Sequence, residues 1–586
     1  MARGHLTADA LAELPLLAGL PQQLLERLAV DAREVHVEAG GWLFRAGDEA
    51  RAAYVVRSGR LEVVAAGPPA VVMGVLRRGT LFGELALLTD SARSASVRAR
   101  RDSSVVELGR DQFEMLIDSV PGFAASLARS LGAQLAARGQ PATARSTPRT
   151  VAVIALDAGA PCEAVASRLA TTLGHHGRVA VLGSDPDRVP GDYMGLLDRA
   201  ERANDRVLLA GGCASRGEPW TDFCRQEADV LVAVTRGVPD RTWIDSPAPL
   251  EGCELVVAGG SGIAEHIVDT IAPREVHVLR SDAEIEVGLA IAARRLSGRS
   301  LGLVLSGGGA RALAHVGVYD ALHDAGFVID RFGGTSMGAV ISAILATGAT
   351  PRELHAMIRN GFIAENPSND YTLPAYSLIR GRKTYALLRA AFGSTRIEEL
   401  PRRFFCVSTD LQTRRSVVHR TGLLADAVFA SLAIPGIFPP VADSRGRMLV
   451  DGGVLDNLPV EPMARTGEGP VIAADVSQRG SAATGNGRPR LNGLKRRVRR
   501  ALTGSELTIP RVSDTLMRSF TINSNDTVAA ALRHADLVIL PRVDGVGMLD
   551  WKKFPQALEI GQQAALAALE EAGERVETWT RRAKGA

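Results

Sequence analysis

The stretch FVIDRFGGTSMGAVISAILATG, residues 327–348, joins an apolar, strand-like segment to a helix-like segment through a serine flanked by glycines. Gly334, Ser336 and Gly338 fit the pattern G-x-S-x-G. Glycine at these two positions lets the backbone turn sharply and approach its neighbours closely, so that the serine hydroxyl stands clear of the sheet. The pattern therefore predicts an α/β domain in which Ser336 is a nucleophile.

A second glycine turn lies upstream, after the apolar segment LGLVL (301–305). It contains Gly307, Gly308 and Gly309 and precedes a helix-like segment. Backbone N–H groups at such a turn can hold a phosphate or a developing oxyanion. The spacing departs from G-x-G-x-x-G at its last position, which is Ala312. We therefore favour a hydrolase oxyanion hole over a dinucleotide site.

Asp451 follows the apolar segment GRMLV and precedes two glycines. A carboxylate at the end of a strand can sit in a crevice and accept a proton from a serine. An α/β-hydrolase triad would require a histidine after the acid, and His534 is the only one there. We interpret His534 as structural, and His315 as a packed helix residue, which favours a dyad of Ser336 and Asp451.

Three spaced motifs, SGGGAR, GTSMGA and DGGVLDNLPV, resemble the patatin-like phospholipases over residues 298–477. The segments DYTLP (370–374), SLIRGRK (377–383) and ASLAIPGIFPP (430–440) are similar to its bacterial and neuropathy-target-esterase branch. The resemblance implies a Ser336–Asp451 dyad without histidine, metal or cofactor. It also implies an oxyanion hole of Gly307, Gly308 and Gly309 with Arg311 beside it. Ala312 departs from the family, which usually has a fourth glycine there.

The N-terminal segment alternates short apolar runs with glycine turns, which predicts a small β-roll. Within it, FGELALL (82–88) and the residues that follow resemble the phosphate-binding cassette of cyclic-nucleotide-binding domains. A helix N-terminus and a guanidinium can hold a cyclic phosphate, and a glutamate can accept a hydrogen bond from a ribose hydroxyl. The resemblance implies a site for cAMP or cGMP as a regulatory ligand, and a ligand-free scaffold is the alternative. The site residues would be Gly83, Glu84, Arg93 and Ser94.

Between residues 149 and 282, six apolar runs alternate mostly with helical or loop stretches: VAVIALD, VAVLGSD, RVLLAGG, DVLVAV, ELVVAGG and VHVLRSD. This alternation is typical of a parallel sheet and predicts a Rossmann-like α/β domain. The first lysine of the chain is Lys383, so a P-loop cannot exist here. We interpret this domain as a spacer of unknown activity.

The predicted organisation is that of a multidomain protein, as its 586 residues require. Its parts are a cyclic-nucleotide-binding-like β-roll at 10–136, a linker at 137–149, an α/β spacer at 150–290, a patatin-like α/β hydrolase domain at 298–478, a basic linker at 479–504, and a C-terminal extension of the hydrolase domain at 505–580.

The composition favours a cytoplasmic protein. Five cysteines without CxxC spacing argue for a reducing compartment, and no run of about 18 apolar residues suggests a spanning helix. The net charge of +3 gives no argument for nucleic-acid binding.

Seven basic residues and no acid lie between 488 and 500, with leucines near one helical face. Residues 488–502 are therefore a candidate contact with an anionic membrane, and a solvated loop is the alternative.

Together these features predict a serine hydrolase that cleaves carboxylic esters of phospholipids or lysophospholipids. Two alternatives stay open: a non-catalytic signalling module that senses a nucleotide, and an acyltransferase that uses the same dyad.

Overall fold

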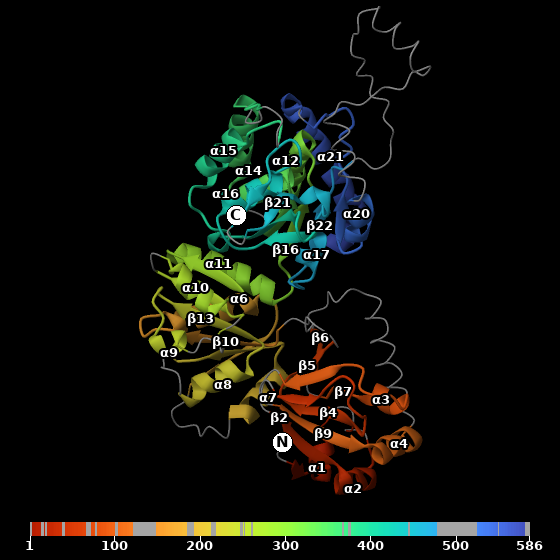
Figure 1. Cartoon of the computed structure of the whole chain (residues 1–586). Helices are drawn as coiled ribbons and strands as arrows, with labels where there is room; N and C mark the ends of the chain where they lie inside the picture. Colours follow the sequence, from red (N-terminus) through yellow and green to blue (C-terminus); the bar gives the residue numbers. More distant parts are fainter. Residues whose placement is uncertain are drawn as a thin grey trace, which may run out of the picture. The chain divides into compact units, whose positions relative to one another are not determined.

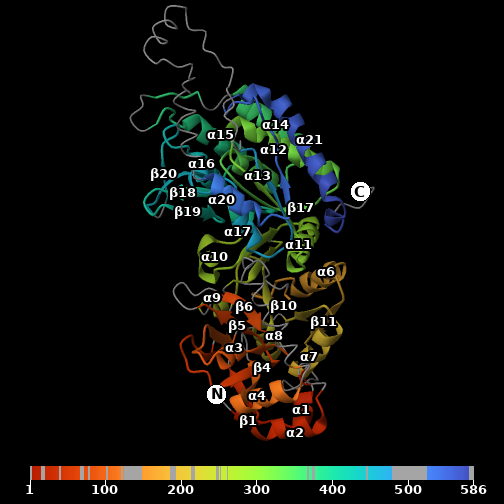
Figure 2. The same cartoon turned by 90° about the vertical axis from the view of Figure 1, so that its right-hand side faces the viewer.

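A computed structural model describes residues 3–579 with gaps. The gaps are at 13, 15–16, 18–19, 38–40, 66–71, 77–78, 100–102, 121–122, 124–147, 185–192, 213–217, 246–249, 251, 260–261, 366–368, 373–376, 444–445, 478–523 and 549. The chain divides into two compact units, and each is described by itself. Unit 1 holds residues 1–170, 177–253 and 266–272, and unit 2 holds the rest. Figures 1 and 2 show the elements of both units.

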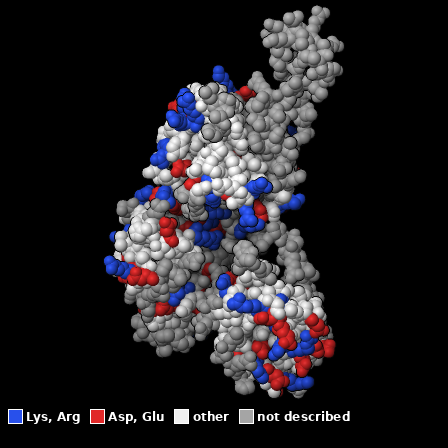
Figure 3. All heavy atoms as spheres, in the orientation of Figure 1, with Lys and Arg blue, Asp and Glu red and all other residues white. Residues whose placement is uncertain are grey.

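The start of unit 1 is the expected β-roll. Its strands are β1 (Arg3–His5), β2 (Arg33–Val37), β3 (Trp42–Phe44), β4 (Ala52–Ser58), β5 (Leu61–Val64), β6 (Val72–Leu76), β7 (Leu81–Phe82), β8 (Ser96–Ala99) and β9 (Ser103–Gly109). They form two sheets with the orders β1-β2-β9-β4-β7 and β3-β8-β5-β6. The short helices α1 (Ala8–Ala12), α2 (Gln22–Asp31), α3 (Glu84–Leu88) and α4 (Arg110–Ser119) accompany them. Basic and acidic side chains lie interspersed over this roll on the face shown in Figure 3.

The six expected strands of the middle segment all form. They are β10 (Thr150–Ala155), β11 (Val179–Gly183), β12 (Arg206–Ala210), β13 (Val230–Thr235), β14 (Glu254–Ala258) and β15 (Glu275–Leu279). In unit 1 the order is β11-β12-β10-β13, and these pairs are parallel. A Rossmann-like order is not confirmed, because in that fold the second strand lies beside the first. Arg60 of the roll is buried and pairs with Asp229 at 3.0 Å and Glu201 at 3.2 Å.

The middle segment also supplies α6 (Cys162–Gly174), α7 (Tyr193–Ala203), α8 (Pro219–Glu227), α9 (Arg241–Ile244), α10 (Glu265–Ile271) and α11 (Asp282–Leu296). In unit 2, β14 and β15 form a parallel pair.

The main sheet of unit 2 carries the serine turn. Its strands are β16 (Leu301–Leu305), β17 (Ile329–Thr335), β18 (Arg403–Asp410), β19 (Arg415–His419), β20 (Val441–Ala442), β21 (Met448–Asp451), β22 (Val471–Ala474) and β23 (Leu537–Ile539). The order is β20-β21-β18-β17-β16-β22-β23, and β19 also pairs with β18. Strands β18, β17, β16, β22 and β23 run parallel, whereas β21 is antiparallel to β18.

Helices cover both faces of this sheet. One face packs against η3 (Gly309–Leu313), α12 (Ala314–Asp324), α13 (Met337–Ala346), α14 (Pro351–Ile358), α15 (Arg382–Phe392), α16 (Leu424–Leu432) and α21 (Phe554–Ala572). The other face packs against α17 (Val460–Ala464) and α20 (Ser524–Leu532). The remaining short elements are η4 (Arg359–Ala364), η5 (Ile397–Glu399), η6 (Gly452–Val454), η7 (Trp551–Lys553) and η8 (Gly573–Val576).

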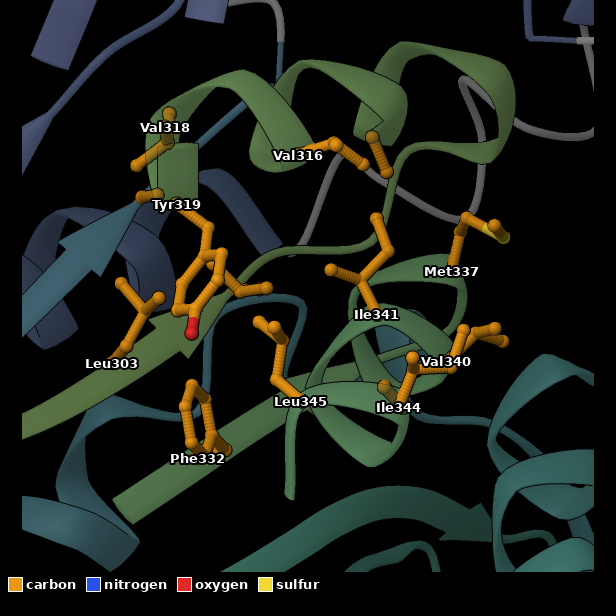
Figure 4. Packing of buried hydrophobic residues seen from close by; sticks show 14 of the residues in the cluster. Leu303, Val316, Val318, Tyr319, Phe332, Met337, Val340, Ile341, Ile344 and Leu345 are labelled. Atoms are coloured by element: carbon orange, nitrogen blue, oxygen red, sulfur yellow. The ribbon is translucent and has the colours of Figure 1, made fainter. Parts of the chain in front are cut away.

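The core of unit 2 lies where α12 and α13 meet β16 and β17. Figure 4 shows Tyr319 of α12 and Leu345 of α13 beside Phe332 of β17. Burial of such apolar side chains is the main stabilising contribution to a fold of this kind. Because α12 follows the glycine loop and α13 follows Ser336, this packing fixes both turns on a rigid base.

Candidate active site

Ser336 forms a strained turn between β17 and α13. Its backbone has φ 55° and ψ −127°, a conformation that residues other than glycine rarely adopt, and the residue is buried. A Cβ on Gly338 would lie 2.4 Å from the Leu305 carbonyl oxygen, and one on Gly334 would lie 2.7 Å from the Gly338 carbonyl carbon. Both flanking positions therefore require glycine.

Ser431 of α16 holds this turn from the side. The Ser336 N–H donates to the Ser431 Oγ at 3.0 Å, and the Ser431 hydroxyl donates to the Val407 carbonyl at 2.7 Å. Because the serine amide is fixed in this way, it is not available to a bound substrate. Sequence reasoning missed this contact. Ser431 lies in the quoted segment ASLAIPGIFPP, but nothing in the sequence indicates which amide it accepts.

The carboxyl ends of β17 and β21 meet beside β18. Thr335 pairs with Val407 and Asp451 pairs with Ser408, the next residue of β18. Since β17 is parallel and β21 antiparallel to β18, the register of both pairs decides where the two strands end. A Cβ on Gly452 would lie only 3.0 Å from Thr335 Cγ2. The register thus brings together Ser336 and Asp451, which are far apart in the sequence.

Asp451 is a buried carboxylate with few compensating contacts. Burial raises its pKa to about 6, although hydrogen bonding by the Ser336 side chain and the Gly453 N–H acts to lower it. The Gly453 N–H donates to Oδ1 at 2.8 Å. A carboxylate with a pKa near 6 is ionised at neutral pH and still basic enough to accept a proton from a hydroxyl.

The glycine loop passes directly beside Ser336, since a Cβ on Gly307 would lie 3.0 Å from Ser336 Cβ. The Gly307 N–H is already used, because it donates to the Asn457 carbonyl at 3.2 Å. The N–H groups of Gly308 and Gly309 have no acceptor among the residues that the structure describes. These two N–H groups are therefore the free donors of the loop. Arg311 lies farther along, and its Nε donates to the Val546 carbonyl at 2.9 Å.

Neither histidine considered above lies in position to act as the base. His315 is fully buried, its Nε2 lies 3.0 Å from the Ser306 carbonyl, and burial lowers its pKa to about 4. His534 precedes the amino end of β23, whereas Ser336 follows the carboxyl end of β17. Because these strands are parallel, the two residues lie at opposite ends of the strands. A third histidine, His419, contacts the Ser408 Oγ at 2.7 Å, and burial lowers its pKa to about 4 as well.

In the roll, the cassette residues surround a buried cation. The Arg93 guanidinium donates to the Gly83 carbonyl at 2.8 Å and to the Ala52 carbonyl at 2.7 Å. It also lies 4.2 Å from the centre of the Phe44 ring. Glu84 is buried and Ser94 is exposed. These two hydrogen bonds use two of the five N–H groups of the guanidinium, so others are left with which it could bind a phosphate.

Two family models match this chain. Residues 303–464 match the family model of the patatin-like phospholipases, and residues 34–120 match that of the cyclic nucleotide-binding domain. The solved structure of a mutant cAMP-binding acyltransferase from Mycobacterium smegmatis is 33% identical over 22% of this chain and 41% of that chain, with a TM-score of 0.21.

Similarity over the whole chain identifies the family. A lysophospholipase NTE1 from Coccidioides immitis is 28% identical over 90% of this chain and 40% of its own length. An uncharacterized NTE family protein from Mycobacterium tuberculosis is 37% identical over 97% of this chain and 97% of its own length. The chain is thus a hydrolase with a patatin-like phospholipase domain, and it belongs to the NTE family.

Proposed function

We propose that this protein hydrolyses carboxylic esters of phospholipids or lysophospholipids with a dyad of Ser336 and Asp451. The observation that carries the proposal is the convergence of three groups: a strained serine, a buried carboxylate with a pKa of about 6, and a glycine loop with two free N–H donors among the described residues. The name of the NTE1 relative supports lysophospholipids as a substrate class.

In the first half of the reaction, Asp451 accepts the proton of Ser336 while the serine Oγ attacks the ester carbonyl carbon. The carbonyl oxygen becomes an oxyanion, which the N–H groups of Gly308 and Gly309 stabilise. The tetrahedral intermediate then collapses. The bond to the alcohol oxygen breaks, the alcohol leaves with the proton held by Asp451, and an acyl-serine remains.

In the second half, water replaces the alcohol. Asp451 accepts its proton as the water oxygen attacks the acyl-serine. The bond between the acyl carbon and the serine Oγ then breaks, the proton passes from Asp451 to that Oγ, and the fatty acid leaves. The Ser431 hydroxyl accepts a hydrogen bond from the Ser336 amide and so holds the backbone of the turn in place.

Labelling with a fluorophosphonate, followed by mass spectrometry, tests the nucleophile. We expect the adduct on Ser336 and no labelling of Ser336→Ala. The matched control is Ser342→Ala, a buried serine of α13 whose hydroxyl donates to the Gly333 carbonyl at 2.9 Å. That variant should label like the wild type. A folded wild-type protein that is not labelled and releases no fatty acid from lysophosphatidylcholine would favour the non-catalytic signalling module.

Product analysis separates hydrolysis from acyl transfer. With a phospholipid donor and a lysophospholipid acceptor, the proposal expects free fatty acid as the main product. A main product in which the acyl group has moved to the acceptor would make the protein an acyltransferase.

We also propose that the roll binds a cyclic nucleotide through Gly83, Glu84, Arg93 and Ser94, and that the nucleotide regulates the hydrolase. The match of residues 34–120 to the cyclic nucleotide-binding model supports this. Calorimetry of the full chain with cAMP and cGMP is the test. Arg93→Ala should lose about ten- to a hundredfold in affinity, as expected for a charge-assisted phosphate contact. Absence of saturation at millimolar nucleotide would make the roll a ligand-free scaffold.

Peripheral membrane contact through residues 488–502 is likewise proposed, although this segment lies outside the described residues. Among those that are described, no helix combines the length and the apolar character needed to cross a bilayer. Sedimentation with anionic vesicles tests the contact. Neutralising Arg496, Arg497, Arg499 and Arg500 should weaken binding and leave hydrolysis of a small soluble ester unchanged.

A further inference from the structure

Residues 543–548, here called the C-terminal strap, run against the glycine loop. The Ala310 N–H donates to the Met548 carbonyl at 2.8 Å, and the Arg311 Nε donates to the Val546 carbonyl at 2.9 Å. A Cβ on Gly309 would lie 2.5 Å from the Met548 carbonyl oxygen, so the strap touches the loop backbone itself. The strap lies well outside the segment that matches the patatin-like model, 303–464.

These contacts flank the two free N–H donors of the loop. Gly307 is held on one side by Asn457, and Ala310 and Arg311 are held on the other side by the strap. Gly308 and Gly309 lie between these anchors. Gly309 has φ +58°, which its backbone must keep for its N–H direction to be preserved. If the strap moved, the loop would lose one of its two anchors and the direction of these donors would be less well defined.

The strap is connected to the helices that cover one face of the sheet. After it come η7 and α21, and α21 crosses α12 with the two backbones in direct contact. A Cβ on Gly317 of α12 would lie 1.9 Å from the Leu558 carbonyl oxygen, and one on Gly561 of α21 would lie 1.9 Å from the Ala314 carbonyl oxygen. Only glycine fits at both positions. Because α12 directly follows the loop and α21 follows the strap, the contact between these two helices fixes the position of the strap relative to the loop.

Two side chains brace the strap from the solvent side. The Asp550 carboxylate accepts a hydrogen bond from the Gly547 N–H at 2.9 Å, and the Lys553 ammonium donates to the Gly545 carbonyl. Asp550 is exposed, and both of these hydrogen bonds lie at the exposed surface. Changing these residues can therefore loosen the strap while the core stays intact.

We propose that the C-terminal strap positions the oxyanion hole: it holds Ala310 and Arg311 so that the N–H groups of Gly308 and Gly309 point at the developing oxyanion. Asp550 and Lys553 are positioning residues, because they act through the strap and do not touch the substrate. This inference rests on the proposed serine hydrolysis. Preorganised donors matter most when charge develops, so the strap should affect the transition state more than substrate binding.

The test compares Asp550→Ala and Lys553→Ala with two references, each measured in the full chain. Asp550→Asn keeps an acceptor for the Gly547 N–H, and Lys552→Ala removes a neighbouring lysine. Active sites are first counted by fluorophosphonate titration, so that kcat refers to folded, reactive protein only. We expect kcat per site to fall about tenfold in Asp550→Ala and KM to stay unchanged. This loss of kcat is smaller than the loss expected when an oxyanion donor is removed altogether. Asp550→Asn and Lys552→Ala should stay within about twofold of the wild type.

A second readout distinguishes positioning from folding. A trifluoromethyl ketone analogue of the ester adds to the serine Oγ and becomes an oxyanion, while the matching methyl ketone binds without forming this charge. The affinity of the trifluoromethyl ketone should fall in step with kcat in Asp550→Ala, and the methyl ketone should bind as it does to the wild type. Unchanged kcat per titrated site in both alanine variants, or equal losses for the two ketones, would overturn the proposal. Failure of the wild type to be labelled would instead overturn the proposed function.

Discussion

Two of the buried carboxylates of unit 2 behave in opposite ways. Asp451 and Glu468 each expose 5% of their surface. Burial raises the pKa of Asp451 to about 6. Burial also acts to raise the pKa of Glu468, but the charges of Arg295, Arg403 and Arg274 outweigh this and bring it well below the usual range.

The difference lies in the partners that each sequence position acquires. Glu468 pairs with Arg295 at 3.1 Å, Arg403 at 2.6 Å and Arg274 at 2.5 Å. Among the described residues, the groups that hydrogen-bond the Asp451 carboxylate are one amide and one hydroxyl, and neither carries a charge. Equal burial thus yields a permanently ionised structural group in one place and a group poised to accept a proton in the other.

The largest expected effect is the loss of catalysis on neutralising Asp451. Asp451→Asn should lower kcat by at least about a thousandfold, because the amide cannot accept the serine proton. The double variant with Ser336→Ala should be scarcely worse than either single variant, since the two act together. Fatty acid release per mole of folded protein measures this.

Asp456→Asn is the matched control for that experiment. Burial, followed by the charge of Glu461, raises the pKa of Asp456 to about 6 as well, but Ser336 is not among the groups that shift it. This variant should keep activity within about tenfold. Equal losses in both variants would mean that a raised pKa in this loop, and not the contact with the serine, is what matters.

Next in size is the effect of Glu468→Gln on stability. Removing this charge leaves buried Arg295 and its neighbours with less compensation, so the free energy of unfolding should fall by about 3–5 kcal/mol. Urea unfolding, together with hydrogen exchange in β16 and β22, measures it. The exposed pair Glu461–Arg465 offers the control, because Glu461→Gln should change stability by less than about 1 kcal/mol.

Asp451→Asn should instead stabilise the fold at neutral pH. The folded pKa of about 6 lies above the ordinary value of 3.8, so the folded state holds a proton that the unfolded state releases between these values. The stability that protonated Asp451 contributes to the wild-type fold is therefore fully present below pH 3.8, and it is lost as the pH rises through about 6. Above a pH of about 7 the variant should be more stable than wild type by roughly 1–3 kcal/mol. A gain that persists at a pH of about 4 would contradict this assignment.

The smallest effect is the pH dependence of the wild-type enzyme. With a small soluble ester, kcat/KM should rise about tenfold per pH unit below pH 6 and level off above a pH of about 7, because the proposed role of Asp451 as a base requires its ionised form. A profile that is flat from about pH 5 to about pH 8 would show that a different group limits the reaction.

The sequence predicted the individual elements of this site better than their arrangement in space. The serine turn, the glycine loop and the end of β21 were recognisable because each combines an apolar strand with glycines whose role is local. The strand order was not readable, since parallel pairing depends on packing among distant segments. For the same reason the Rossmann-like order of the middle segment was not confirmed.

What the sequence missed consists of contacts between distant segments. The Ser431 hydroxyl accepts a hydrogen bond from one particular amide, that of Ser336. The Asn457 carbonyl accepts one from the Gly307 N–H, so Gly307 is not a free donor of the loop. Met548 and Val546 offer backbone carbonyls, whose positions no side-chain pattern encodes. Such contacts arise only once the sheet register and the helix crossings are known.

The crossing of α12 and α21 at Gly317 and Gly561 has a consequence for the timing of synthesis. The serine turn and Asp451 are translated well before α21, and domains assemble as their segments leave the ribosome. A nascent chain that already carries both residues of the proposed dyad would still lack the strap and the helix that supports it. We therefore expect the protein to be catalytically silent while it is being made. We expect full activity only after the C-terminal helix has docked.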